Sequence, residues 1–384
     1  MLADSGHAVT IFERFAEPRP IGAGLLLQPT GLAVLRALGL ADEAMARGAR
    51  VDGLEGRTHR GRSVLELAYA DLHPKAHGVG ILRSVLFELL HQRLLRSATH
   101  LRVGSEIVDV VRQQTTASVV DRGGSVHGPF DLVVVADGAH STLRQRLMPA
   151  ARAPLYPWGC IWATVPDLAG IGAAHLLRQR VRGTTEMMGL LPVAEGQLTM
   201  YWSVPVDRLA PGQPIDLVAW RRTATALWPE AAAIVDHAAS VDSFSRATYR
   251  HVALSSWHVG PIVFIGDAAH GTSPQLGQGA NLGLLDAHAL ARSIAESEDL
   301  AAALALLARR RDGPVRFYRQ ASHLLTPFFQ SHAGTLGIMR DAFMGMSCHL
   351  PGMRGLMAST LAGTRRGWLS SVALDADGRY RLEG

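Results

Sequence analysis

Apolar and polar positions along the 384-residue chain form two kinds of pattern, which predict short buried strands and longer amphipathic helices. Three apolar runs, 9–12, 131–136 and 261–265, each end directly before a turn that carries a carboxylate. The run at 131–136 is nearly continuous, which is typical of a strand covered on both faces. The pattern therefore predicts three buried strands that bring polar groups to the mouth of a sheet.

Helical and hairpin patterns lie between these strands. Residues 31–38 predict a helix that Thr30 or a neighbour caps and Gly39 stops, and residues 83–96 predict an amphipathic helix. Hairpins are predicted at 51–77, a β-meander at 101–130 and a helix cap at Ser141.

Residues 153–256 differ from the preceding part of the chain in their sequence pattern, because aromatic side chains occur on strand-like segments there. These segments predict a separate antiparallel sheet, interrupted by a helix over 215–228. After the strand at 261–265 the pattern is mostly helical to the end of the chain. The strand-like segments are 158–165, 186–191 and 197–204.

The composition describes a globular protein, with 48% hydrophobic and 18% charged residues. The formal net charge of +5 would suit nucleic acid, but the basic residues are scattered, and Lys75 is the only lysine among 38 Lys and Arg residues. The longest basic run is Arg309–Arg311, late in a predicted helix, where cations suit the helix dipole. We therefore expect no nucleic-acid partner.

Cysteine usage and hydropathy indicate a cytoplasmic protein. Cys160 and Cys348 lie far apart, without the spacing of a metal site or a disulfide framework. No uninterrupted apolar run reaches the roughly 18–20 residues that a membrane span needs. The first residues contain Asp4 and His7 and do not resemble a signal peptide.

Glu13 closes the first predicted strand, where a carboxylate can accept hydrogen bonds from the ribose of a dinucleotide or can simply be solvated. In dinucleotide-binding folds this acid follows a Gly-x-Gly-x-x-Gly fingerprint by about 20 residues. Counting about 20 residues back from Glu13 would place the fingerprint before Met1. The glycines at Gly22 and Gly24 do not replace it, because the third glycine is missing. Met1–Gly6 predicts the last turn of a helix, so we expect the true start upstream of Met1. The alternative is a degenerate protein or one completed by a partner.

Two further strand-end turns suit a cofactor. The backbone N–H groups of the Asp137–Gly138 turn and the following helix favour an anion, although the aspartate could instead cap that helix. After Asp267, Pro274 offers a rigid flat surface to an aromatic ring, and Gly277 and Gly279 let backbone N–H groups approach a ligand.

No catalytic constellation accompanies these turns. The sequence contains no Gly-x-Ser-x-Gly nucleophile motif, no His-Glu-x-x-His motif and no Cys/His cluster. We therefore name no catalytic residue and expect no metal site. The chemistry would come from a cofactor that the protein holds and orients.

At these positions the chain resembles the FAD-dependent aromatic hydroxylases, the class A flavoprotein monooxygenases with the para-hydroxybenzoate hydroxylase fold. Residues 136–144 look like the family's Asp-Gly motif, associated with the FAD pyrophosphate and NAD(P)H, and residues 266–281 look like its Gly-Asp motif. The segment from Ile21 to Leu40 resembles the stretch that follows the ribose-binding strand. The resemblance implies FAD contacts by Glu13, Arg14, Arg83, Asp137, Gly138, Gly266, Asp267, Pro274, Gly277, Gly279 and Asn281.

The resemblance also implies an α/β fold with a Rossmann-like FAD-binding domain, without its first strand, an inserted antiparallel substrate sheet and C-terminal helices. The C-terminal segment either packs on the body or forms an interface, as in a homodimer. The FAD-binding domain would comprise 1–50, 78–152 and 257–330, the substrate sheet region 51–77 and 153–256, and the C-terminal helical segment 331–384.

The implied reaction uses NAD(P)H and O2 to hydroxylate an aromatic or polyketide-like small molecule through a flavin C4a-hydroperoxide. The substrate would lie between the flavin and the sheet, and core packing is the alternative role for each pocket candidate. The candidates are Met187, Met200, Tyr201 and Trp202.

Two alternatives stay open. One is another flavoenzyme of this fold, such as a halogenase, whose tryptophan signature Trp158 and Trp162 faintly resemble at the wrong spacing. The other is an N-terminally truncated relative without enzymatic activity.

Overall fold

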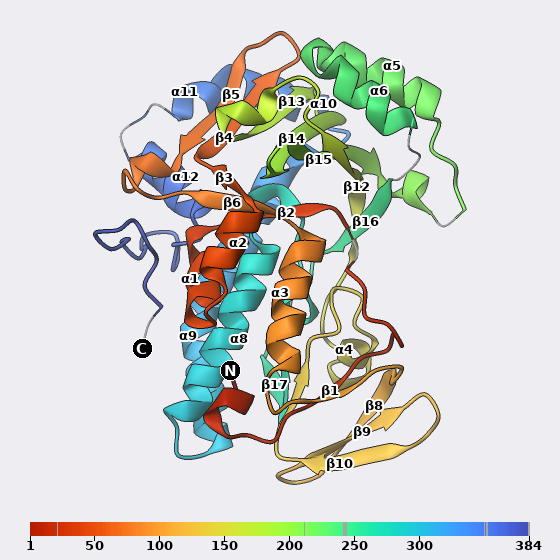
Figure 1. Ribbon diagram of the computed structural model, residues 1–384, viewed down its shortest axis with the longest axis vertical. Coiled ribbons are helices and arrows are strands. Elements are labelled where there is room, and N and C mark those ends of the chain that lie inside the picture. The colour runs from red at the N-terminus through yellow and green to blue at the C-terminus, as the bar shows by residue number, and fades with distance from the viewer. Residues whose placement is uncertain (21, 211, 241–243, 349, 351, 383–384) are drawn as a thin grey trace.

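The computed structural model describes residues 1–20, 22–210, 212–240, 244–348, 350 and 352–382, so Ile21 of the segment above lies outside it. Figure 1 shows a large sheet flanked by helices in its upper part, and a group of helices with smaller sheets in its lower part. The predicted α/β class is confirmed.

The large sheet has seven strands in the order β16-β12-β15-β14-β13-β4-β5. All its pairings are antiparallel except that of β13 with β4, where Leu176 lies opposite Gly53. The antiparallel prediction is wrong for this pair, because the two strands come from distant segments and no tight hairpin sets their direction. The strands are β4 Gly53–Thr58, β5 Ser63–Ala68, β12 Leu155–Pro166, β13 Leu176–Arg182, β14 Glu186–Ala194, β15 Gln197–Pro205 and β16 Ser245–Arg250.

Helices α5 (Leu217–Leu227) and α6 (Ala232–Ser240) cover one face of this sheet (Figure 1). Their apolar residues pack with those of β12, β14 and β15 in one buried cluster that includes Met200, Trp202 and Trp220. The opposite face of the sheet therefore remains for other contacts.

Four smaller sheets complete the β-structure of the described residues. β1 pairs in parallel with β7, and β11 pairs in parallel with β18. The meander at 101–130 is confirmed as β8, β9 and β10. The strands are β1 Thr10–Phe12, β2 Gly24–Leu27, β3 Ala49–Val51, β6 Gly78–Leu82, β7 His100–Arg102, β8 Ile107–Arg112, β9 Ala117–Asp121, β10 Val126–Phe130, β11 Val133–Val135, β17 His258–Val259 and β18 Ile262–Phe264.

The burial of the predicted strands differs. β18 is buried along its whole length, as expected. The prediction that the run at 131–136 is covered on both faces is wrong, because Val134 is 37% exposed. β11 is an edge strand in the described part of the chain, with β18 as its hydrogen-bonded neighbour, so less of it is covered.

The helices start and end close to their predicted positions. α1 begins earlier than expected, with Pro29 in its first turn, so Thr30 lies inside the helix and does not cap it. The Ser141 cap is confirmed, since its side chain accepts a hydrogen bond from the N–H of Arg144. These helices are α1 Pro29–Ala37, α2 Ala41–Arg47, α3 Arg83–Leu95, α4 Thr142–Leu147, α7 Asp267–His270, α8 Gly279–Ala295 and α9 Leu300–Leu325.

The prediction of helix to the end of the chain is right only as far as Leu361. Gly363 adopts a φ of +83°, a left-handed conformation that ends helices, and residues 362–382 are irregular. The helices here are α10 Gly334–Met339, a π-helical turn Arg340–Met344, α11 Gly345–Ser347 and α12 Met353–Leu361. None of the described helices is long and apolar enough to cross a membrane.

Candidate functional site

A cavity of about 800 Å³ lies between the strand-end turns and the face of the large sheet that α5 and α6 do not cover. The part lined by the turns is called the cofactor end, and the part lined by the large sheet is called the sheet end. The cofactor end includes Arg83, Gly138, Gly266, Asp267, Pro274, Gly277 and Gly279. The sheet end includes Leu65, Trp162, Gln179, Met187, Tyr201 and Tyr249.

The cofactor end presents exposed backbone at two glycines. Gly277 adopts a φ of +62°, which favours glycine, and it ends the short turn that begins at Pro274. Gly279 then opens the 17-residue helix α8. The first N–H groups of a helix lack partners within it, so this end of α8 offers hydrogen-bond donors and a positive dipole to an anionic group.

Buried Arg144 joins two of the predicted turns. Its guanidinium donates to the carbonyl of Ala139 (2.7 Å) in the Asp137–Gly138 turn and to the carbonyl of Ala268 (2.9 Å) in α7. Burial lowers the pKa of Arg144, and the neighbouring Asp137 partly offsets this effect. The side chain thus holds the two strand ends at a constant separation.

Asp286 anchors the Gly266 turn from α8. Its carboxylate is fully buried and accepts hydrogen bonds from Gly266 N (2.9 Å), His270 Nε2 (2.5 Å) and Arg311 Nε (2.7 Å). Burial alone raises the pKa of this carboxyl, but His270 and Arg311 outweigh it and lower the pKa to about 2. Asp286 is therefore ionised at neutral pH.

Asn281 does not line the cavity. Its fully buried amide accepts from Gln28 N (2.9 Å) and donates to the carbonyls of Leu26 (3.0 Å) and Gly277 (3.1 Å). These three bonds tie β2 to the Gly277 turn. Asn281 thus shapes the cofactor end from behind.

Three other predicted cofactor residues also lie outside the cavity lining. Glu13 follows β1, and its carboxylate accepts a hydrogen bond from Phe15 N (2.8 Å). The guanidinium of Arg14 lies over the Phe15 ring, 4.6 Å from its centre. Asp137 is exposed beside Gly138, which does line the cavity.

The cofactor end fits a large polar group such as FAD. It combines one cation, Arg83, one carboxylate, Asp267, and the open start of α8. Buried Gln28 accepts a bond from Tyr69 at its Oε1, but its Nε2 has no partner in the described part of the chain. This Nε2 lies 3.8 Å from the position that a side chain on Gly277 would take, so a donor without a partner sits at the turn.

One row of paired residues crosses six strands of the large sheet and forms the floor of the sheet end. Neighbouring members lie directly opposite each other in the strand pairings. The row is Trp162, Tyr201, Gly189, Gln179, Gly56 and Leu65, on β12, β15, β14, β13, β4 and β5.

Within this row the Tyr201 ring lies across Gly189 and reaches Gln179. The Nε2 of Gln179 donates to the Tyr201 hydroxyl. Burial raises the pKa of Tyr201, and neighbouring Cys160 adds to this effect, so the hydroxyl stays protonated. Burial also raises the pKa of the Cys160 thiol to about 11, which argues against a thiolate nucleophile at this site.

Replacing Gly189 with alanine is expected to destabilise the protein by about 1–3 kcal/mol, because the new Cβ would lie 2.2 Å from two Tyr201 ring carbons. Urea unfolding measures the change. Gly355→Ala is the control, since no atom lies within 4 Å of the added Cβ in that helix. Equal stabilities of Gly189→Ala and the wild type would show that Tyr201 does not depend on this gap.

Two of the predicted substrate residues lie on the wrong face. Met187 and Tyr201 line the cavity, whereas Met200 and Trp202 pack in the core under α5 and α6. Trp202 meets Trp220 edge to face, with ring centres 6.4 Å apart. The prediction fails for these two because successive strand residues point to opposite faces.

The sequence patterns missed several residues of the site. Gln179 and Tyr249 come together only through strand pairing, and no local motif marks them. Asp286 lies on α8, the helix that follows the Gly-Asp turn, and its carboxylate reaches back to Gly266. An aspartate on that helix is a signal in the sequence that could have indicated this contact. Within the described residues no cluster of His, Cys, Asp and Glu suits a metal ion.

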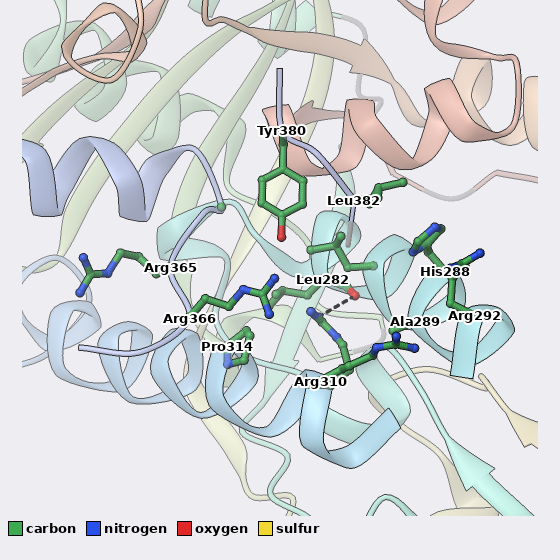
Figure 2. Close-up of a pocket in the computed structure, with 13 residues that line it drawn as sticks. Leu282, His288, Ala289, Arg292, Arg310, Pro314, Arg365, Arg366, Tyr380 and Leu382 are labelled. Carbon is green, nitrogen blue, oxygen red and sulfur yellow. Dashed lines mark hydrogen bonds between the residues drawn. The ribbon is translucent and has the colours of Figure 1, made fainter. Parts of the chain in front are cut away.

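A second cavity, of about 50 Å³, lies between α8, α9 and residues 363–382, and several arginines gather around it (Figure 2). Arg311 pairs with Asp286 and also donates to the Leu282 carbonyl (3.3 Å). Arg292 and Arg310 pair with Glu296. This cavity is too small for a dinucleotide, and the ion pairs of Arg292, Arg310 and Arg311 are formed with residues of the same chain, so we assign it to packing of the C-terminal residues.

Known proteins share this architecture. The model of a family described as FAD binding domain matches residues 1–312. A 2-heptyl-3-hydroxy-4(1H)-quinolone synthase of Pseudomonas aeruginosa is 28% identical over 325 residues, which cover 82% of this chain and 81% of that protein.

Solved structures agree on the fold. The tetrameric form of 2-methyl-3-hydroxypyridine-5-carboxylic acid oxygenase is 23% identical with a TM-score of 0.76, and covers 93% of this chain and 91% of that chain. HpxO of Klebsiella pneumoniae, complexed with FAD and uric acid, is 20% identical with a TM-score of 0.79, and covers 96% of this chain and 93% of that chain.

The family match extends over most of the chain and includes every strand-end turn of the cofactor end. The likeness in fold extends over nearly all of it. The chain therefore belongs to the FAD binding domain family, as one of the FAD-dependent aromatic hydroxylases, which are monooxygenases with FAD as cofactor.

Proposed function

We propose that this protein uses NAD(P)H and O2 to hydroxylate a small aromatic molecule held between FAD and the large sheet. The observation that carries the proposal is that the cofactor end and the sheet end belong to one continuous cavity. Bound FAD would supply the redox chemistry, in which NAD(P)H and O2 place one oxygen atom on the substrate and release the other as water.

The cofactor end would hold FAD through a few named groups. Asp267 would accept hydrogen bonds from hydroxyl groups of the cofactor, and Arg83 would face its negative charge. The open N–H groups near Gly277 and Gly279 would stabilise an anionic ring system, and Pro274 would pack beside it. Glu13, Arg14, Asp137, Gly138 and Gly266 would contact other parts of the FAD.

The rest of the protein would place the substrate and exclude water. Apolar lining at the sheet end disfavours water, and a dry site strengthens the electrostatic interactions inside it. In this proposal residues 1–50, 78–152 and 257–330 form the FAD-binding domain, and residues 51–77 and 153–256 form the substrate sheet region. Residues 331–384 form the C-terminal segment. No side chain is assigned as an acid or base.

The test is reconstitution followed by turnover. The purified protein is loaded with FAD, its visible spectrum is recorded, and NADH or NADPH consumption is followed with a panel of phenols and 4(1H)-quinolones under ¹⁸O2. We expect bound flavin and one ¹⁸O atom in the product. A protein that binds no FAD, even when FAD is added, would overturn the proposal, and a bromide-dependent halogenated product would favour the halogenase alternative.

We further propose that the protein acts in the cytoplasm as a homodimer. Exposed apolar side chains follow one another along α10 to α11, including Ile338 (72% exposed) and Phe343 (62% exposed). Clusters of exposed apolar residues commonly mark interfaces. Light scattering of the purified protein measures the oligomeric state, and a monomer at micromolar concentration contradicts this part of the proposal.

A further inference from the structure

The sheet end of the cavity carries no charged side chain among the described residues that line it. The charged residues of the lining are Asp267, at the cofactor end, and Arg83, which lies where the two ends meet and acts electrostatically on Tyr249. A carboxylate moved from water into such apolar surroundings without a partner loses much of its solvation free energy. The sheet end therefore disfavours an ionised substrate.

Gln179 supplies a polar group at this otherwise apolar floor. Its side chain is only 6% exposed, and its Nε2 is engaged by the Tyr201 hydroxyl. Its Oε1 accepts no hydrogen bond from the described part of the chain, and Gln179 is one of the residues that line the cavity.

The neighbours of Gln179 keep that oxygen uncovered. Gly189 and Gly56, which lie directly opposite Gln179 on β14 and β4, carry no side chains, and the Tyr201 ring that fills the space over Gly189 binds the amide at its Nε2. Tyr201 fixes the amide from across Gly189, which leaves the carbonyl half to face a ligand. An amide oxygen accepts hydrogen bonds and donates none.

From these observations we infer that the site takes an uncharged aromatic substrate whose ring N–H or phenolic O–H donates a hydrogen bond to Gln179 Oε1. Gln179 is then a specificity-determining residue, and Tyr201 is a positioning residue that acts through it. The inference rests on the proposed function, because it names the substrate class of the same cavity.

A set of three related ligands tests the inference by binding alone. 4(1H)-Quinolone has a ring N–H and no charge, 1-methyl-4-quinolone lacks the N–H, and 4-oxo-1H-quinoline-2-carboxylate adds a negative charge. Calorimetry with the FAD-loaded protein, without NAD(P)H, gives each Kd. We expect 4(1H)-quinolone to bind about tenfold more tightly than the methylated ligand, and the carboxylate to bind weakest.

The variant Gln179→Met separates the hydrogen bond from the added methyl group. It keeps the length of the side chain but removes the acceptor, so we expect it to abolish the difference between the N–H and N-methyl ligands. The control is Gln330→Met, which removes another buried glutamine whose Nε2 donates to Ser203 Oγ (2.8 Å) and which does not line the cavity. The control is expected to retain the tenfold preference.

Several outcomes would overturn the inference. They are tighter binding of the carboxylate, an unchanged ligand preference in Gln179→Met, and no binding of any of the three ligands. If Gln179→Met does not fold, the comparison of 4(1H)-quinolone with its carboxylate on the wild type still decides the charge requirement.

The failure of the proposed function would look different. A protein that binds 4(1H)-quinolone with the expected preference but places no ¹⁸O on any ligand retains the inferred binding class and refutes the oxygenation. Conversely, a protein that hydroxylates only carboxylated substrates retains the oxygenase function and refutes the inference.

Discussion

Replacing Asp286 with alanine is expected to lower the free energy of unfolding by about 3–5 kcal/mol. The substitution removes the acceptor of three buried hydrogen bonds, including the one from Arg311, whose side chain is only 6–7% exposed. The guanidinium would then be buried without this counter-ion. The Gly266 turn would lose the acceptor of its N–H, so we also expect weaker retention of FAD.

Urea unfolding at neutral pH measures this change, with Glu106→Ala as the matched control. Glu106 also pairs with an arginine through two hydrogen bonds, but this pair lies at the surface, where water and salt screen the two charges and the pair contributes little to stability. Equal losses of unfolding free energy in the two variants would show that burial does not make the Asp286 network more stabilising than a surface ion pair.

The same carboxylate predicts how stability depends on pH. Its pKa is about 2 in the folded protein and 3.8 in its ordinary state, so the unfolded chain binds the proton more readily. The stabilisation of about 2 kcal/mol is complete above pH 4 and is lost as the pH falls from about 4 to 2. In Asp286→Asn this component of the pH dependence should be absent.

Replacing Asp267 with alanine is expected to weaken FAD binding about 10- to 100-fold while leaving the fold intact. Asp267 is an exposed carboxylate in the cavity lining, and its Oδ1 lies 3.7 Å from the Cβ position of Gly279 at the start of α8. A hydrogen bond between a hydroxyl of FAD and a charged acceptor contributes about 1.5–3 kcal/mol. Fluorescence titration of the flavin-free protein with FAD measures the Kd.

Asp299→Ala controls for the loss of an aspartate at a helix start. Asp299 caps α9 by accepting a bond from Ala302 N (2.8 Å) and does not line the cavity. Its replacement is expected to cost about 1 kcal/mol of stability and to leave the FAD affinity unchanged. An Asp267→Ala protein with the wild-type Kd would remove Asp267 from the cofactor site.

The cofactor end was largely predictable from the sequence because its signals are local. An apolar run followed by Gly266 and Asp267 encodes a strand, a turn and a helix within about twenty residues, and the structure places this turn beside the Gly138 turn in one cavity. The role of Asn281 was less predictable. The resemblance to the family's Gly-Asp motif implied a cofactor contact, whereas the three hydrogen bonds of Asn281 tie β2 to the Gly277 turn.

The sheet end was much less predictable, because its composition depends on which strands become neighbours. Aromatic and methionine residues at 187–202 indicated a core or a pocket, but the face of each side chain depends on where α5 and α6 pack. One residue separates Tyr201, in the cavity, from Trp202, in the core. The alternation of side chains along a strand puts successive residues on opposite faces of the sheet, but it does not determine which face the helices cover.

The sequence by itself thus determined the fold class, the Gly138 and Gly266 strand-end turns and the absence of a nucleophile motif, since each depends on residues close together in the chain. Only the tertiary structure decided what the cavity can hold. Gln179, Gly189 and Tyr201 belong to three strands, and Asp286 and Arg311 to two helices. Their hydrogen bonds form only after long-range pairing has positioned them, and no pattern in the linear sequence records that pairing.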